Sequence, residues 1–336
     1  MSNDHFVAQT YLRHFGDPST GGMLHAYRKR DGKTFRCWPK DVFHEWDGDQ
    51  NRLLQHSQLL GDFRKMIEPW WNPSVATLLR GNMTYHDKFV VAGYLANLMT
   101  CTPAWRRVGV TMVEQSTRAQ LSFAKRMKLK HGGQPKLNVE AVEALENGKL
   151  AIDVEPDYIK GLATKNLMQY TWIIYNLDWE VLLNDSAVPF LTSDNPCALS
   201  YSGSPHESVR RILPITPQLA VTMQFDPRSK PAAERVSQSE LGACLQRPPR
   251  GSITFSRCSG VLATSLNVIQ ARSAEELVFS SIGSDEIHQL VRDAARFRMD
   301  VRHVEFPDPS GEPDAIITGS ILSVREHQGV ASARNR

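Results

Sequence analysis

The stretch of this sequence with the clearest chemical potential is PFLTSDNPCAL, residues 189–199. A short apolar segment of strand-like composition runs directly into Thr-Ser-Asp-Asn-Pro, so Asp194 falls where the chain must turn. A rigid strand end is a favourable place for a catalytic carboxylate. The same Asp-Asn pair also suits an Asx-turn that only stabilises the bend, and composition by itself favours that structural interpretation.

A second set of polar residues lies near the N-terminus, in HFVAQTYLRHF, residues 5–15. His5 and Gln9 are four residues apart and Arg13 follows four residues later, so on a helix the three would share one face. A single histidine is more often structural than catalytic. Three polar side chains along one stripe, set among apolar residues, favour a functional face.

One acidic stretch, HEWDGDQNR, resembles the start of a calcium-binding loop, with Asp47, Asp49 and Asn51 at alternate positions. Its sixth position is Arg52 rather than Gly and its twelfth is Gln58 rather than Glu, so we interpret it as an ordinary turn. We predict no metal site and no cofactor. The chain also lacks the motifs of P-loop NTPases, dinucleotide enzymes, α/β hydrolases, zinc peptidases and zinc deaminases.

The charge of the chain is unevenly distributed. The formal net charge is +3, yet residues 104–131 carry seven basic side chains against the single acid Glu114. This stretch is either a solvated helix face or a surface that follows phosphates, and the asymmetry favours the second interpretation. The predicted DNA-binding residues are Arg106, Arg107, Arg118, Lys125, Arg126, Lys128 and Lys130.

The elements that must position these residues follow from periodicity. Apolar spacing predicts helices over 51–71 (interrupted by Pro69 and Pro73), 85–101, 104–130, 138–148, 155–175, 260–277 and 284–298. An Asp-Gly turn within 23–38 predicts a hairpin, and short strand-like runs follow Asp178.

We therefore predict a helix-rich α+β protein with one catalytic domain over 1–322. Its helical half would span 50–175 and its sheet-containing half 176–322, with a small sheet mainly in the second half. The polar tail 323–336 is expected to be mobile.

Composition is typical of a soluble globular protein. Hydrophobic residues make up 41% of the chain and charged residues 22%. The five cysteines are scattered, without CxxC pairs or zinc-type spacing, as expected for reduced thiols in a cytoplasmic protein. No secretion-signal pattern opens the chain, and its apolar runs are too short to span a bilayer, so no membrane partner is expected.

Together these segments resemble a bacterial family, domain-of-unknown-function family 4238. HFVAQTYLRHF is similar to its opening H-[FY]-V-P-Q-x-Y-L-R-x-F, PFLTSDNP to its strand ending in T-S-D-N-P, and TCTPAWRR to a segment ahead of basic residues. Ala8 replaces the usual Pro, and Thr102 stands where Arg is common. The matching family markers are His5, Gln9, Tyr11, Leu12, Arg13, Asp194, Asn195 and Pro196.

Some members of that family resemble DNA glycosylases that act on modified phage bases, such as glucosylated hydroxymethylcytosine, in antiviral defence. The resemblance implies that the N-terminal segment packs beside the strand carrying Asp194. Asp194 would stabilise the oxocarbenium-like sugar or activate water, while His5 or Asn195 would assist the departing base.

The remaining roles concern substrate binding. Gln9, Tyr11 and Arg13 would contact the flipped nucleotide in double-stranded phage DNA. Trp70, Trp71 or Tyr85 could stack or act as a wedge, although buried core aromatics are commoner.

Two other functions fit the same sequence. A metal-dependent nuclease toxin would gather acids such as Glu45, Asp47, Glu68 and Asp194 around a divalent cation. A non-catalytic nucleic-acid-binding adaptor of a defence locus would need only the basic surface. The sequence by itself leaves both alternatives open.

Overall fold

The computed structural model describes residues 3–131, 138–200, 209–225, 247–307 and 316–326. Its body is built around a five-stranded sheet of order β10-β5-β9-β8-β7, in which β10 runs parallel to β5 and the other neighbours are antiparallel. The strands are β5 (Asp178–Asn184), β7 (Ala198–Ser200), β8 (Val209–Thr216), β9 (Leu219–Phe225) and β10 (Ile253–Cys258).

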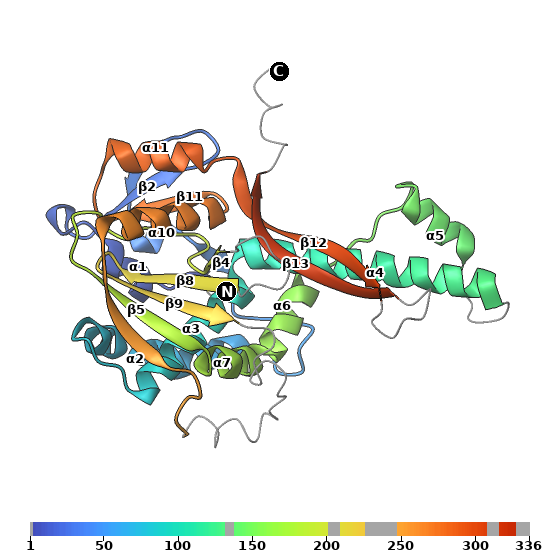
Figure 1. Ribbon diagram of the computed structural model, residues 1–336, viewed down its shortest axis with the longest axis horizontal. Helices are drawn as coiled ribbons and strands as arrows, with labels where there is room; N and C mark the ends of the chain where they lie inside the picture. The colour runs from blue at the N-terminus through green and yellow to red at the C-terminus, as the bar shows by residue number, and fades with distance from the viewer. Residues whose placement is uncertain (1–2, 132–137, 201–208, 226–246, 308–315, 327–336) are drawn as a thin grey trace.

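Both faces of this sheet are covered by helices (Figure 1). Successive side chains of a strand point to opposite faces. Val181 therefore packs with the helices α2 (Leu59–Leu79), α3 (Tyr85–Cys101) and α7 (Leu167–Tyr175). Leu182, the next residue, packs with α10 (Gly260–Ser273) on the other side. The apolar runs of the strands reflect this burial on two faces.

A second sheet joins the two halves of the chain. Its order is β3-β2-β11-β6, with β2 (Leu24–Arg28) and β3 (Thr34–Cys37) from the predicted hairpin and β6 (Thr192–Ser193) and β11 (Leu277–Ser280) from the second half. The helix α11 (Asp285–Asp293) packs on this sheet through Ile287 and Val291, which contact the cluster around Tyr27.

The N-terminal segment is tied to the body at both ends. The strand β1 (Asn3–His5) pairs antiparallel with β4 (His44–Trp46), and α1 (Gln9–Leu12) follows. Short 3-10 turns lie at Arg13–Phe15, Pro18–Thr20 and Pro39–Asp41.

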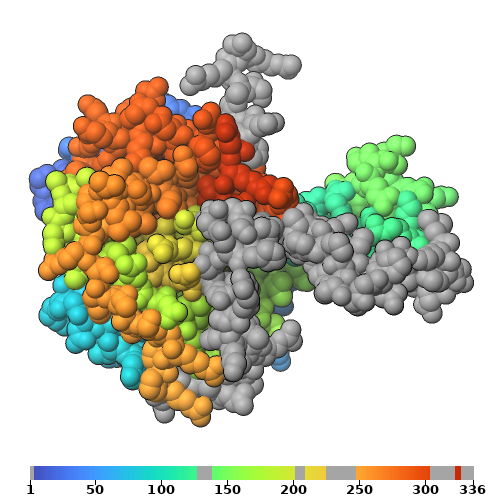
Figure 2. Space-filling model, in the orientation of Figure 1, coloured from blue at the N-terminus to red at the C-terminus, as the bar shows by residue number. Residues whose placement is uncertain are grey.

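An arm projects from the body (Figures 1 and 2). It consists of α4 (Pro103–His131), α5 (Val139–Glu146) and the hairpin of β12 (Phe297–Pro307) and β13 (Ile316–Glu326), which runs beside α4. At its base lies α6 (Pro156–Lys165).

Several element boundaries differ from the sequence-based expectation. The segment 51–58 forms turns, and α2 continues through Pro69 and Pro73 to Leu79. Both prolines face solvent, where water can satisfy the carbonyls that lose an N–H partner, while the apolar face of α2 stays packed.

Other helices are shorter than periodicity suggested. The predicted helix over 155–175 is divided at Asn166 into α6 and α7. The predicted helices over 260–277 and 284–298 end at Ser273 and Asp293, and strands follow each of them. Burial on a sheet, rather than amphipathic spacing, decides these ends.

The helix-rich α+β class is confirmed. The larger sheet lies in the second half as expected, whereas the smaller sheet draws strands from both halves. Within the expected tail, Ser323–Glu326 belong to β13, and 327–336 lie outside the described residues. No helix in the described part of the chain is long and apolar enough to cross a membrane.

Candidate functional site

The structure places Asp194 immediately after β6, where the sequence predicted it, but buries it. Its carboxylate accepts three consecutive backbone N–H groups, from Glu275 at 2.8 Å, Glu276 at 2.6 Å and Leu277 at 2.9 Å. Only 5% of the residue is exposed. The carboxylate therefore fixes the connection between α10 and β11 instead of pointing out of an open strand end.

Lys29 lies in the same buried network. Its ammonium donates to the carbonyls of Ala274 at 2.6 Å and Phe297 at 2.8 Å. Burial raises the pKa of Asp194 to about 6, although the three N–H bonds and Lys29 oppose that rise. Burial also lowers the pKa of Lys29 to about 8. The structure thus assigns Asp194 a structural role.

Asn195 belongs to the same buried network. We call this network, which comprises Lys29, Asp194, Asn195 and Gln270, the lock. The side-chain amide of Asn195 donates to the carbonyl of Ser273 at 2.9 Å, and Gln270 donates to the backbone carbonyl of Asn195 at 3.1 Å. These bonds attach the segment after β6 to the last turn of α10. Asn195 is fully buried and its side-chain N–H is engaged by the protein itself, which does not favour its expected role beside the departing base.

His5 and Gln9 do meet, although not on one helix as the spacing suggested. His5 ends β1 and Gln9 begins α1. The Nε2 atom of His5 lies 3.3 Å from Gln9 Nε2 and 3.3 Å from the Lys40 carbonyl, so its tautomer selects which bond forms. Arg13 donates to Gln9 Oε1 at 3.3 Å and is exposed. The predicted stripe is therefore a chain of polar contacts.

Beneath this chain lies the buried Arg64 of α2, with partly buried acidic side chains around it. The guanidinium is paired with Asp49, and its Nε donates to Asn97 Oδ1 at 3.0 Å. The backbone N–H of Asp49 donates to the Asp4 carboxylate at 3.1 Å. Glu68 follows Arg64 by one helical turn. Burial raises the pKa of both Asp49 and Glu68, against the opposing charge of Arg64.

Glu45 of β4 is in a different electrostatic state. Burial pushes its pKa upwards, but a bidentate pair with Arg106, at 3.0 and 2.7 Å, outweighs this and leaves the pKa lowered. Burial lowers the pKa of His5, and the charge of Arg64 adds to that effect. At neutral pH the site therefore combines an ionised Glu45, a neutral His5 and a Glu68 that protonates more readily than usual.

Lys160 of α6 completes this group by donating to the carbonyls of Gly48 and Gln50. We call the set the N-terminal polar cluster. It comprises Asp4, His5, Glu45, Asp49, Arg64, Glu68 and Lys160. Five of these residues line one crevice that is too narrow to hold a water molecule, and Asp49 and Glu68 interact electrostatically with Arg64.

Sequence reasoning missed Arg64 and Lys160 and dismissed Asp49 with the calcium loop. A signal was available for Arg64, because it occupies a position on the buried face of α2 beside Leu60, Phe63 and Ile67. A charged residue in such a position needs a partner, and that partner is a functional candidate.

Tyr11 does not face a substrate site. It is fully buried, its hydroxyl donates to the Pro214 carbonyl at 2.6 Å, and it lies 2.7 Å from the Thr192 hydroxyl. Its ring packs against Trp71 and Tyr94. The expected substrate-binding role of Tyr11 is therefore replaced by a structural one that ties α1 to both sheets.

The basic stretch of α4 is largely neutralised by acids, most of them from other elements. Arg106 pairs with Glu45, and Arg107 makes a bidentate pair with Glu275 at 2.7 and 3.0 Å. Arg118 is paired with Glu114, and Lys125 with Glu143 and Glu146. Arg126 is exposed, and the side chains of Lys128 and Lys130 lie outside the described residues. The expected surface is thus reduced to the outer end of the arm.

The aromatic candidates divide by exposure. Trp71 is buried in the core, which removes it as a wedge. Trp70 and Tyr85 are each 51% exposed, and the ring of Trp70 meets that of His86 edge to face at 5.0 Å. Stacking by Trp70 or Tyr85 remains sterically open.

The acids proposed for a nuclease do not converge. Glu45 and Glu68 belong to the N-terminal polar cluster, whereas Asp194 lies in the lock beside β11. Within the described residues, no group of three or more His, Cys, Asp or Glu side chains is arranged to hold a metal ion.

The comparisons with known proteins give one match. A family model described as "Protein of unknown function (DUF4238)" matches residues 3–284. The chain belongs to this family. No curated protein and no solved structure matches it. The family region includes both the N-terminal polar cluster and the lock around Asp194. The two motifs that carry the resemblance therefore lie in two separate parts of the molecule.

Proposed function

We propose that this family member is a DNA glycosylase that removes a modified base, such as glucosylated hydroxymethylcytosine, from phage DNA in the bacterial cytoplasm. Such an activity would leave abasic sites and serve antiviral defence. The supporting observation is that Glu45 and Glu68, both in the N-terminal polar cluster, have pKa values displaced in opposite directions. Oppositely tuned carboxyl groups are what glycosidic-bond hydrolysis requires.

The proposed chemistry uses this pair. Water attacks C1′ of the nucleotide while the C–N bond breaks and its electron pair leaves with the base, and the proton that the attacking water loses passes to bulk solvent. Glu68, protonated more readily because of its burial, donates a proton to the departing base. Glu45, kept ionised by Arg106, stabilises the positive charge that develops on the sugar. His5 and Gln9 offer hydrogen bonds to the base edge or the sugar hydroxyls.

The surroundings supply groups for holding DNA. Arg13 is exposed beside Gln9 and can reach a phosphate, and Arg126 is exposed on α4. Trp70 and Tyr85 can stack on an unpaired base. A base must leave the helix before it can be excised, and aromatic side chains assist that step.

The test uses two duplex DNAs, one unmodified and one carrying glucosylated hydroxymethylcytosine. Each is incubated with the protein in EDTA, and released base and alkali-labile sites are measured. We expect release from the modified DNA alone. Glu68→Gln should reduce it by at least about a hundredfold, the lower limit for losing a general acid. Glu140→Gln, on an exposed position of α5, is the matched control and should keep full activity.

Other outcomes favour the alternative functions. Strand breaks that appear only with magnesium would support a nuclease. Tight, salt-dependent binding without release from either DNA would support a non-catalytic adaptor. Full base release by Glu68→Gln would remove the N-terminal polar cluster as the catalytic site.

A further inference from the structure

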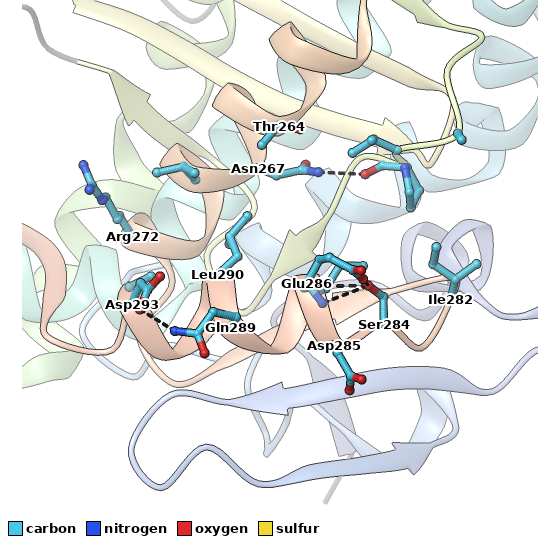
Figure 3. Close-up of a pocket in the computed structure, with 16 residues that line it drawn as sticks. Thr264, Asn267, Arg272, Ile282, Ser284, Asp285, Glu286, Gln289, Leu290 and Asp293 are labelled. Carbon is cyan, nitrogen blue, oxygen red and sulfur yellow. Dashed lines mark hydrogen bonds between the residues drawn. The ribbon is translucent and has the colours of Figure 1, made fainter.

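A wide groove lies between α10 and α11, outside the N-terminal polar cluster (Figure 3). Its volume is about 1070 Å³, comparable with the largest ligand sites of proteins. The two helices form its walls, and the segment 187–189 before β6 contributes to its floor. The proposed glycosylase chemistry uses none of these residues.

The interior of the groove is mainly apolar. Val188, Val268 and Leu290 are only partly covered, and Ile282 at one end is 44% exposed. The one buried polar side chain of the lining, Asn267, is occupied by the protein. It donates to the Pro189 carbonyl at 2.8 Å and accepts the Leu191 N–H at 2.9 Å. Binding here must therefore come from burial of apolar surface.

The rim of the groove is acidic. Asp285, Glu286 and Asp293 lie along α11 and are exposed. The hydroxyl of Ser284 donates to Glu286 and lowers the pKa of that carboxyl. The basic residue of the lining, Arg272, has its guanidinium over the Phe297 ring at 4.4 Å. A ligand that fills the groove thus meets an apolar floor and more negative than positive charge.

We propose that the groove docks a basic amphipathic helix of a partner protein. An apolar stripe of that helix would pack on Val268, Ile282 and Leu290, and its flanking Lys or Arg side chains would meet the acidic rim. The lining residues of α10 run from Thr264 to Arg272 and those on the α11 side from Asp285 to Ala294, lengths of about 12 and 14 Å, which suit a partner helix of two to three turns. Charge complementarity selects a basic partner over an acidic one.

The test uses two labelled 14-residue probes, an amphipathic helix of Leu and Lys and the same helix with every Lys replaced by Glu. Fluorescence anisotropy at low salt should show saturable binding of the lysine helix to the full chain. Binding of the glutamate helix should be at least tenfold weaker. Equal binding of both probes, or no saturable binding, would overturn the proposal.

Variants place the binding in the groove. Asp285→Asn combined with Asp293→Asn should weaken binding of the lysine helix about fivefold, as expected for two exposed charge pairs. The control pair Glu140→Gln and Asp153→Asn removes two exposed acids elsewhere and should change it less than twofold. An equal loss in the control pair would show non-specific charge attraction and contradict the groove assignment.

The second variant is Leu290→Ala, which should weaken binding about tenfold. Because Leu290 also packs against the buried cluster of α11, its urea midpoint is measured alongside. If the wild-type chain self-associates and does not bind the probe, and Leu290→Ala no longer self-associates, a second copy covers the groove and the proposal fails.

Discussion

Replacing Asp194 by alanine separates the structural role of this residue from a catalytic one. In the folded protein its carboxylate accepts three backbone N–H groups in a buried setting. A hydrogen bond to a charged group contributes roughly 1.5–3 kcal/mol, so the loss of three costs about 4–9 kcal/mol. The substitution also removes a buried charge, whose cost is reflected in the pKa of about 6.

The cost of burying the Asp194 charge in the wild type offsets part of the stability that is lost with the three hydrogen bonds. A pKa displaced by about two units corresponds to roughly 3 kcal/mol between the protonation states. We therefore expect Asp194→Ala to lower the free energy of unfolding by about 1–6 kcal/mol. Urea unfolding followed by tryptophan fluorescence should show a midpoint lower by about 1 M or more. Asp293→Ala, an exposed residue of α11 that accepts a bond from Gln289, is the control and should change stability by less than about 0.5 kcal/mol.

The same carboxyl predicts a pH signature. Its pKa in the folded state, about 6, is above the ordinary aspartate value of 3.8, so the folded state binds more protons between those values. Its contribution to stability therefore falls as pH rises from about 4 to 6 and is constant above that range. This component of the slope should be missing in Asp194→Ala. Unchanged stability in this variant, together with complete loss of base release, would refute the structural assignment and return Asp194 to the chemistry.

Three further substitutions test the packing. Tyr11→Phe should lower the free energy of unfolding by about 1–3 kcal/mol, because the buried Pro214 carbonyl loses its hydrogen-bond donor. A urea titration measures this loss. The hydrogen bond of a histidine lowers the pKa of the Asp17 carboxyl to about 2, so this carboxylate stabilises the wild type above about pH 4 and ceases to do so as pH falls towards 2. Asp17→Asn should therefore be less stable than the wild type above about pH 4, and the difference should shrink towards pH 2. Comparing the two proteins at pH 5 and 2.5 tests the sign, and an equal gap at both contradicts it. Gly251→Ala should lower the melting temperature by several degrees, because a Cβ there would lie 2.0 Å from the Leu177 carbonyl oxygen, and an unchanged melting temperature would contradict that clash.

Local patterns were sufficient for the main elements. The apolar run of α3 and the short apolar runs of β5, β8 and β9 follow directly from composition, as does the hairpin of β2 and β3. Boundaries were less predictable, because they depend on what each segment packs against. The prolines of α2 show this, since a solvent-facing position tolerates the missing hydrogen bond.

The candidate site was only partly predictable. His5, Gln9 and Arg13 were identified from their spacing, and they do lie together. Arg64 was missed, although its place among apolar residues of one helix face was visible. Composition by itself favoured a structural role for Asp194, but its three donors could not be predicted, because they belong to a connection more than eighty residues later in the chain.

The sequence by itself determined the family, the α+β class and the concentration of basic residues in α4. Only the tertiary structure decided what those charges do. Arg106 meets a carboxylate 61 residues away and Arg107 one 168 residues away. Secondary structure reflects interactions within a few residues, which a sequence pattern records. Ion pairs and the displacement of pKa values depend on burial and on distances in space, which the order of residues does not reveal.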